Sequence, residues 1–200
     1  MKRVIITAFF IIAIICFFIF FKKIDYKSFN NGNNMISSSP DEKILNMSYY
    51  KAIAEVTVNS NKNTNKYIIN QEYSGPDYCM QEIVKPDNIA GTRFNFKEGK
   101  LTIENTRLNI QTIYENYQFI NSNSLFLSSF IQEYKESEKT KREENNDEII
   151  LQVDLKDTSN YKARKRLYID KKNGNPKRLE VQDTTQNILV YILYNEIEIN

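Results

Sequence analysis

The chain has 200 residues, of which 41% are hydrophobic and 26% charged, a composition that fits one globular domain with an additional N-terminal segment. Its 27 basic and 25 acidic residues nearly balance. Without the four basic residues beside the N-terminal apolar run, 23 basic and 25 acidic residues remain. This near balance argues against nucleic-acid binding, which needs a basic face.

The first segment is an uninterrupted apolar run from Val4 to Phe21, with basic residues on both sides. Eighteen residues of helix are about 27 Å long, close to the roughly 30 Å hydrocarbon core of a bilayer. The run ends in FFIFFKK, without the small residues of a signal-peptidase site. We therefore predict an uncleaved transmembrane helix in residues 1–23. The flanking charges fix its orientation only weakly, and we expect the folded part on the extracytoplasmic side.

Cys16 lies within this run. A lipidated cysteine of a bacterial lipoprotein needs a small residue before it, whereas Ile15 precedes Cys16. Lipidation of Cys16 is therefore the alternative, and a structural thiol in the membrane is the preferred interpretation. Residues 24–38 are polar and rich in asparagine and serine, which predicts a flexible tether.

The remaining residues, 39–200, are the predicted folded domain. Ser39, Pro40 and Glu42 have the spacing of a capping box and predict a short helix that ends near Met47. From Tyr49 the apolar residues recur with a period of two. Five strands joined by tight turns predict an antiparallel meander: YKAIAEVTVNS, KYIINQEY, DYCMQEIVK, GTRFNFK and KLTIEN.

The second half begins with residues 108–122, whose pattern leaves helix and strand open. Phe126, Phe130 and Tyr134 then follow at four-residue steps and predict a helix with one apolar stripe. We expect the stripe to pack on the sheet; the alternative is a lid over a ligand cavity. The charge-dense residues 135–148 predict an exposed loop or helix end. Four further strands close the chain: EIILQVDLK, ARKRLYIDK, PKRLEVQD and NILVYILYNEIEI.

These elements predict a mainly β, α+β fold. So long an antiparallel sheet has to curl to cover its apolar face, so we expect a curved half-barrel capped by helices. The last strand, Ile188–Ile199, is long enough to exchange between two protomers, which would give a homodimer.

The chain contains no histidine, which removes histidine-dependent catalysis and histidine zinc sites. Cys79 is the only cysteine of the predicted domain. We interpret it as a small apolar side chain on a strand; the alternatives are a nucleophile and an intermolecular disulfide. Glu72 and Glu82 are a candidate carboxylate pair, with solvent-exposed charges as the preferred interpretation. Glycine-rich phosphate loops and calcium loops are absent from the sequence. We therefore expect no enzymatic activity, no cofactor and no metal.

The spacing of turns and strands from Asp41 to Asn200 resembles the LolA/LppX superfamily of lipoprotein carriers, and within it the GerS-like germination lipoproteins of clostridia. The residues that carry the resemblance lie at turns and strand ends: Tyr73, Pro76, Tyr78, Pro86, Gly99, Gly174 and Pro176. One departure is the residue before Cys16, which does not fit the lipidation signal of such lipoproteins.

The resemblance implies a half-barrel without catalytic residues. For GerS-like members it implies a non-catalytic partner of a cell-wall amidase that modifies the spore cortex, located between the forespore and mother-cell membranes. For LolA-like members it implies a concave apolar face that binds the acyl chains of lipids. We favour the amidase partner, because a spanning anchor prevents a carrier from moving between membranes. Phe126, Phe130 and Tyr134 are the candidate residues for a cavity, a lid or an interaction surface.

Overall fold

A computed structural model describes residues 39–117, 123–155 and 162–200, which belong to one compact unit, Ser38–Asn200. The predicted anchor in residues 1–23, with Cys16, and the tether in residues 24–38 lie outside the described residues. Within the described ranges no helix combines the length and apolar character needed to cross a membrane.

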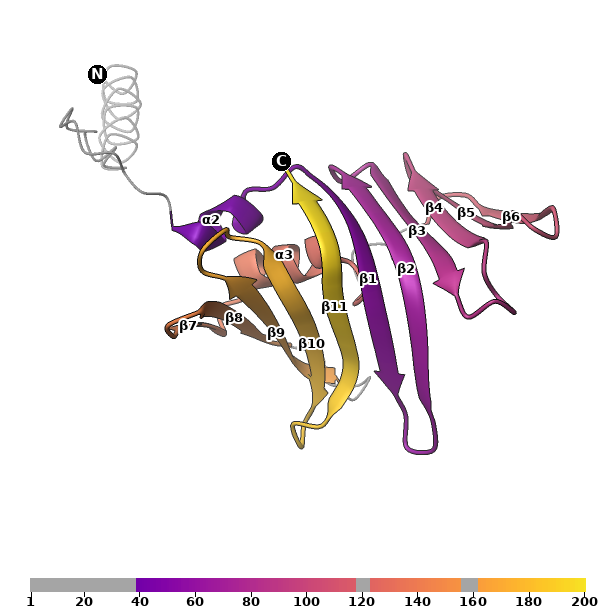
Figure 1. The fold of residues 1–200 in the computed structure, drawn as a ribbon. Helices are drawn as coiled ribbons and strands as arrows, with labels where there is room; N and C mark the ends of the chain where they lie inside the picture. The colour runs from indigo at the N-terminus through magenta and orange to yellow at the C-terminus, as the bar shows by residue number, and fades with distance from the viewer. Residues whose placement is uncertain (1–38, 118–122, 156–161) are drawn as a thin grey trace, which may run out of the picture. The chain divides into compact units, whose positions relative to one another are not determined.

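The described residues form a mainly β fold with two short helices, α2 (Pro40–Leu45) and α3 (Leu127–Glu136). Figure 1 labels these helices and the strands that accompany them. The strands are β1 (Tyr49–Asn59), β2 (Thr64–Ser74), β3 (Tyr78–Lys85), β4 (Thr92–Lys97), β5 (Lys100–Asn105), β6 (Ile110–Tyr114), β7 (Thr140–Glu144), β8 (Glu148–Asp154), β9 (Lys162–Asp170), β10 (Pro176–Asp183) and β11 (Ile188–Ile199).

All these strands belong to one open antiparallel sheet in the order β6-β5-β4-β3-β2-β1-β11-β10-β9-β8-β7. The meander from β1 to β6 and the strands from β7 to β11 meet at the centre, where the first and last strands pair from Tyr50 opposite Ile199 to Val58 opposite Val190. The sheet bends, and α3 lies against one face of it (Figure 1). The predicted curved antiparallel sheet is confirmed, and its open edges are β6 and β7.

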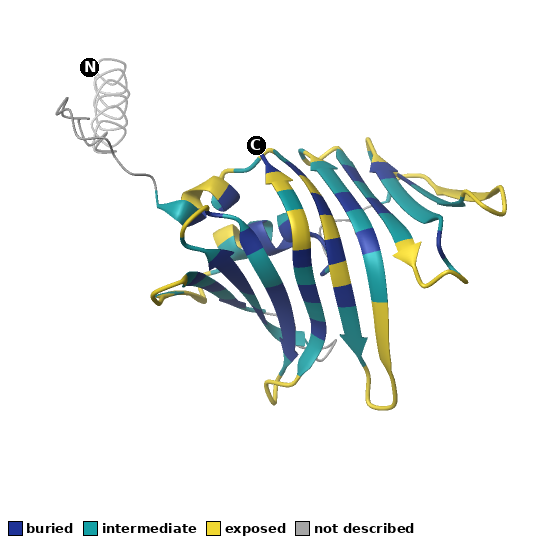
Figure 2. Ribbon diagram, viewed as in Figure 1, coloured by how far each residue is buried: buried dark blue, intermediate teal, exposed yellow. Residues whose placement is uncertain are grey.

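The core lies between this face and the helices. On β1, Ala52, Ala54 and Val56 are buried and alternate with exposed side chains, as the period of two predicts (Figure 2). Phe130 and Leu127 of α3 and Ile44 of α2 are completely buried in the same cluster. Because the cluster runs from Ile44 to Ile199, the unit has a hydrophobic core of its own.

Two strands differ from the sequence expectations. Residues 108–122, left open between helix and strand, include β6, and the charged segment expected to be a loop or helix end contains β7. Neither strand alternates apolar and polar residues, because neither has a buried face. Among the described residues β6 pairs only with β5, and β7 only with β8. Backbone pairing to a neighbour, which no local periodicity reveals, decides both.

The sequence predicts a capping box at the start of α2, but its side-chain hydrogen bonds are not formed. Pro40 begins the helix as predicted, but no side chain caps it, and the Ser39 hydroxyl donates to the carboxylate of Asp41. Helix α2 ends at Leu45, and Lys43 Nζ donates to Asn175 Oδ1 at 3.0 Å in the turn between β9 and β10. At Gly174 in that turn, a Cβ would come within 2.7 Å of the Pro40 carbonyl oxygen, so this close approach requires glycine.

A partly buried ion pair also attaches α2 to the edge strand β7. Arg142 Nε donates to Asp41 Oδ2 at 2.9 Å, and its terminal nitrogens reach Ser39 Oγ and Glu144. The Asp41 side chain is 7% exposed and that of Arg142 38%. The pair therefore fixes α2 to β7, whose one strand neighbour in the described part of the chain is β8.

We expect Asp41→Asn to lower the free energy of unfolding by about 1 kcal/mol at pH 7. The substitution removes a charge-assisted hydrogen bond, whose contribution is reduced because Arg142 is exposed to solvent. Burial raises the pKa of Asp41, but hydrogen bonds from Arg142 and Ser39 outweigh it, and the net pKa is below the usual 3.8. Because the pKa of Asp41 is lower in the folded state than in the unfolded state, the carboxylate contributes its full stabilisation of the folded protein above about pH 4. This stabilisation is lost as the pH falls through the folded-state pKa. Urea titrations should show the two proteins converging below pH 4; a difference independent of pH would contradict the assignment.

Candidate functional site

Helix α3 carries the three residues predicted as a cavity, lid or interaction stripe, and it places them in different surroundings. Phe126 precedes the helix and lines a cavity, whereas Phe130 is completely buried in the core. Tyr134 is half-buried and stacks on Phe130, with ring centroids 5.9 Å apart. The stripe is thus continuous, but only its first residue reaches the cavity.

Hydrogen bonds from β1 and β2 position the start of α3 over the sheet. The Leu127 backbone N–H donates to the Tyr50 hydroxyl at 3.3 Å, and Gln71 Nε2 donates to the Leu125 carbonyl at 2.8 Å. The Tyr50 ring stacks on Tyr73 at 5.7 Å. These contacts fix the backbone on both sides of Phe126, so this wall of the cavity is rigidly placed.

The cavity has a volume of about 200 Å³ and lies between strands β3 to β5 and the segment before α3. Most of its lining side chains are aromatic or aliphatic. They are Cys79, Phe94, Phe96, Leu101, Ile103, Tyr117, Asn123 and Phe126. This volume is below the roughly 300–1,000 Å³ of typical small-molecule pockets, so the cavity suits a narrow apolar group rather than a bulky ligand.

Two buried amide side chains lie beside this apolar wall. Gln71 and Gln81 face each other across β2 and β3, and Gln81 also lies opposite Phe94 of the cavity wall. Gln71 Oε1 and Gln81 Nε2 have no hydrogen-bond partner among the described residues. One acceptor and one donor are therefore left on the inner face of the sheet, a site for a polar group next to an apolar cavity.

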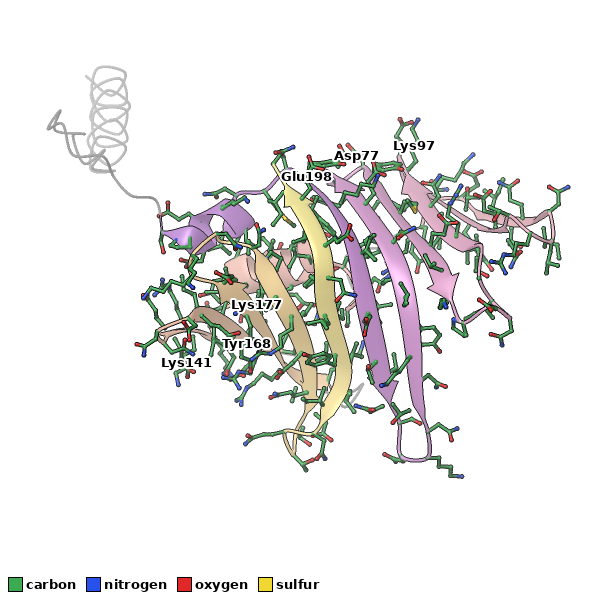
Figure 3. The ribbon with its side chains drawn as sticks, viewed as in Figure 1. Asp77, Lys97, Lys141, Tyr168, Lys177 and Glu198 are labelled. Atoms are coloured by element: carbon green, nitrogen blue, oxygen red, sulfur yellow. The ribbon has the colours of Figure 1, made fainter. Side chains whose placement is uncertain are left out.

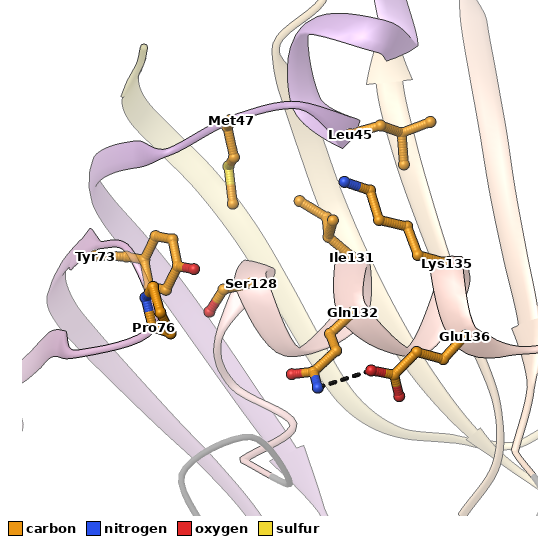
Figure 4. Close-up of a pocket in the computed structure, with 9 residues that line it drawn as sticks. All are labelled: Leu45, Met47, Tyr73, Pro76, Ser128, Ile131, Gln132, Lys135 and Glu136. Atoms are coloured by element: carbon orange, nitrogen blue, oxygen red, sulfur yellow. Dashed lines mark hydrogen bonds between the residues drawn. The ribbon is translucent and has the colours of Figure 1, made fainter. Parts of the chain in front are cut away.

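A second hollow, of about 340 Å³, lies on the surface between the loop after α2, the β2–β3 turn and α3. Figure 4 shows Leu45, Met47 and Ile131 on its apolar side. Gln132, Lys135 and Glu136 supply its polar side, where Gln132 Nε2 donates to Glu136 Oε1 at 2.9 Å. This groove joins polar and apolar side chains, which is typical of protein-binding surfaces rather than of a closed ligand site.

The opposite face of the sheet carries a charged network over β8, β9 and β10, the part of the molecule in which Figure 3 labels Tyr168 and Lys177. The guanidinium of Arg178 lies 3.5 Å from the centroid of the Tyr168 ring and donates to Glu148 at 2.9 Å. Burial and the nearby Glu180 raise the pKa of Tyr168, whose hydroxyl donates to Glu180 Oε2 at 3.3 Å. This network was not predicted from the sequence, although the alternation in RKRLYID and KRLEVQD places its residues on one face.

Cys79 faces the cavity from β3 and is 5% exposed. Burial raises the pKa of its thiol to about 12, so the reactive thiolate is scarcely populated at neutral pH. The geometry supports the preferred interpretation of Cys79 as a small apolar side chain.

Cys79→Ala is expected to cost about 1 kcal/mol of stability, the transfer energy of one small buried group. Because the thiol is buried and protonated, we also expect Cys79 to resist thiol reagents at pH 8 in a Cys16→Ser background. Rapid labelling of the native protein, or loss of partner binding in Cys79→Ala with the fold intact, would restore the thiol as a functional candidate.

The carboxylate pair considered for catalysis is not formed across the strands. The register places Glu72 opposite Met80 and Glu82 opposite Asn70. Arg93 lies between Glu82 at 3.3 Å and Glu104 at 3.1 Å, so the Glu82 carboxylate belongs to an ion-pair cluster. In the part of the chain that the structure describes, no group of three or more acidic, cysteine or histidine side chains is arranged to hold a metal ion.

No family model and no curated protein matches this chain. Among solved structures, it is similar to the GerS lipoprotein in complex with the CwlD amidase of Clostridioides difficile, with 23% identity, a TM-score of 0.54 and coverage of 78% of this chain and 89% of that one. A LolA superfamily protein of Nitrosomonas europaea has 11% identity and a TM-score of 0.41, over 80% of this chain and 92% of the other. A chain of the Pseudomonas aeruginosa MucA/MucB complex has 9% identity and a TM-score of 0.43, over 80% and 55%. The first of these likenesses establishes a common fold with the GerS structure.

Proposed function

We propose that this protein is a non-catalytic, membrane-tethered binding partner that activates a cell-wall amidase on the extracytoplasmic side. The observation that carries the proposal is the fold shared with the GerS lipoprotein, which is in complex with the amidase CwlD. The surface groove of Figure 4 and the buried, protonated Cys79 are consistent with a binding role. The amidase substrate would then be the spore cortex, and the protein would act in spore formation or germination.

The proposal assigns residues 1–23 to an uncleaved membrane anchor, 24–38 to a tether and 39–200 to the binding domain. An 18-residue apolar run closed by lysines supports the anchor. When the full chain is produced in the plasma membrane of vegetative cells whose wall has been removed, protection of the domain from added protease would contradict the extracytoplasmic placement. Incorporation of a radiolabelled fatty acid that Cys16→Ser abolishes would replace the transmembrane anchor by a lipid anchor.

The amidase proposal is tested by co-expressing the full chain with each amidase of the source organism, followed by purification in detergent and an assay of peptidoglycan cleavage. We expect one amidase to co-purify and to cleave faster in the complex. A variant in which Lys135 and Gln132 of the groove are both replaced by alanine tests that surface, with Lys141→Ala on β7 as a control away from it. If no amidase is retained or stimulated, the proposal fails.

A second candidate function is the binding of an acyl chain of a lipid, which the apolar cavity beside Phe126 supports. We expect Ile103→Phe to fill part of this cavity, because Ile103 lines it and is only partly buried. Lipid extraction and mass spectrometry of the full chain would then find a stoichiometric lipid in the wild type and less in Ile103→Phe. If neither protein contains lipid and Ile103→Phe binds the amidase as the wild type does, the result favours the amidase partner over the lipid binder.

A homodimer formed by exchange of β11 stays a prediction. In the structure β11 lies at the centre of the sheet, paired with β1 and β10 of the same chain. Exchange would replace both ladders by identical ladders from a second chain.

A further inference from the structure

Strand β6 and the turn before it expose a cluster of large apolar side chains at one edge of the sheet. Leu108, Ile110, Ile113 and Tyr114 are 66%, 60%, 49% and 48% exposed. All five residues of β6 are exposed, so both faces of the strand lie open (Figure 2). Clusters of this kind on a sheet edge mark interaction surfaces or aggregation sites.

The two edges of the sheet are built differently. Strand β7, TKREE, carries four charged residues, which oppose pairing with another strand. Strand β6, IQTIY, carries no charge and no proline, and its only strand neighbour among the described residues is β5. Within the described ranges its outer backbone N–H and C=O groups pair with no other strand, so they can extend the sheet, and no charged side chain on β6 opposes this.

We propose that β6 pairs with β6 of a second copy of this chain, antiparallel and centred on Thr112. In this register Ile110 of each chain lies opposite Tyr114 of the other, and Gln111 lies opposite Ile113. Ile110, Thr112 and Tyr114 share one face because side chains alternate along a strand. Each Ile–Tyr pair is then a β-branched–aromatic cross-strand pair, which stabilises antiparallel ladders, and no like charges meet.

The sequence of β6 is thus self-complementary, as a two-fold interface requires. The pairing covers apolar side chains on both faces of the strand and leaves the charged β7 edges at the two ends of the joined sheet. Because five residues bury less than the roughly 800 Å² per partner of a standard interface, we expect a weak dimer, with a dissociation constant on the order of micromolar.

Disulfide trapping tests the register directly. The full chain in detergent, with Cys16→Ser and Cys79→Ala, receives Thr112→Cys or, as the matched control on the other edge, Thr140→Cys. Residues opposite each other in an antiparallel pair have Cα atoms about 4.5–5.5 Å apart, within the roughly 4.4–6.8 Å that a disulfide spans, so Thr112→Cys should give disulfide-linked dimers on mild oxidation. Thr140→Cys should stay monomeric. No dimer from Thr112→Cys, or equal dimer from both variants, overturns the proposal.

A second pair of variants measures the interaction itself by sedimentation of the full chain. Thr112→Lys places two ammonium groups opposite each other and should raise the dissociation constant about tenfold or more, whereas Thr140→Lys should leave it unchanged. Circular dichroism and thermal melting should be unaltered in both, because each position is exposed.

Three results would overturn the β6 dimer. The first is a wild type that is monomeric at about 100 µM, beyond the range expected for a small interface. The second is a dimer that Thr112→Lys does not weaken, which would indicate exchange of β11. The third is a monomer whose Thr112→Lys variant loses the amidase, which would assign the β6 edge to that partner. The amidase assay of the wild type is independent of all three.

Discussion

Replacing Phe130 with alanine is expected to lower the free energy of unfolding by about 3–5 kcal/mol, the largest effect of any single substitution considered for this protein. Phe130 is completely buried between α3 and the sheet, and it supports the ring of Tyr134. Removing it takes away the transfer energy of the ring and leaves a cavity that the surrounding sheet cannot close. Urea-induced unfolding followed by circular dichroism measures the loss.

Ser128→Ala, on the same helix, is the matched control. Ser128 lies in the surface groove, so its replacement should change stability by no more than about 0.5 kcal/mol. If Phe130→Ala costs less than about 1 kcal/mol, α3 is not part of the cooperative core. The stripe would then be better described as the lid that the sequence left as the alternative.

Glu133→Ala should destabilise the protein by about 2–3 kcal/mol, because it leaves a buried ammonium without its partner. Lys165 is 1% exposed on β9, and its Nζ donates to Glu133 Oε1 of α3 at 2.8 Å. Breaking a fully buried pair costs about 3–5 kcal/mol of stability. The loss expected here is at or below the lower end of that range, because the Glu133 side chain is 28% exposed. Chemical denaturation at pH 7 gives the value.

The double variant Glu133→Ala, Lys165→Met separates the lost pair from lost packing. It removes both charges and should recover most of the stability, because a well-packed apolar side chain replaces a buried charge at little cost. If the double variant is as unstable as Glu133→Ala, the loss comes from helix packing rather than from an unpaired lysine.

The same pair predicts a dependence on alkaline pH. Burial lowers the pKa of Lys165 below its usual 10.5, although Glu133 opposes this. Lys165 therefore binds its proton more tightly in the unfolded state than in the folded state. As the pH rises through the folded-state pKa, the buried ammonium loses its charge and the cost of burying that charge disappears. Relative to Lys165→Met, the wild type should gain stability towards pH 10.5. A constant difference between the two proteins would contradict a buried charged lysine.

Much of the sheet could be predicted from the sequence. The alternation in β1 and the turns at Gly75, Gly99 and Gly174 placed nine strands close to their observed bounds. Strands such as β1, β3 and β8 bury alternate side chains, which matches the period of two in their apolar residues. The helix around Phe130 was also predicted, since four-residue steps put apolar side chains on one side of a helix.

The candidate site was predicted less completely. The stripe of Phe126, Phe130 and Tyr134 was treated as one surface, but the cavity touches only Phe126 because the backbone turns into the helix at that residue. The cavity also needs Leu101 and Ile103 of β5, which come beside Phe126 only through pairing across three strands. Such long-range proximity has no local signal.

The sequence by itself determined the elements whose local pattern and burial coincide: the alternating strands, the turns and the amphipathic helix. It also determined that histidine chemistry is absent. Only the tertiary structure decided that Tyr50 and Ile199 pair across the centre of the sheet, that Lys165 is buried against Glu133, and that the exposed β6 and the charged β7 form the two edges of the sheet. The physical reason is that these features depend on contacts between residues far apart in the chain, whereas periodicity reports only which side of an element faces the core.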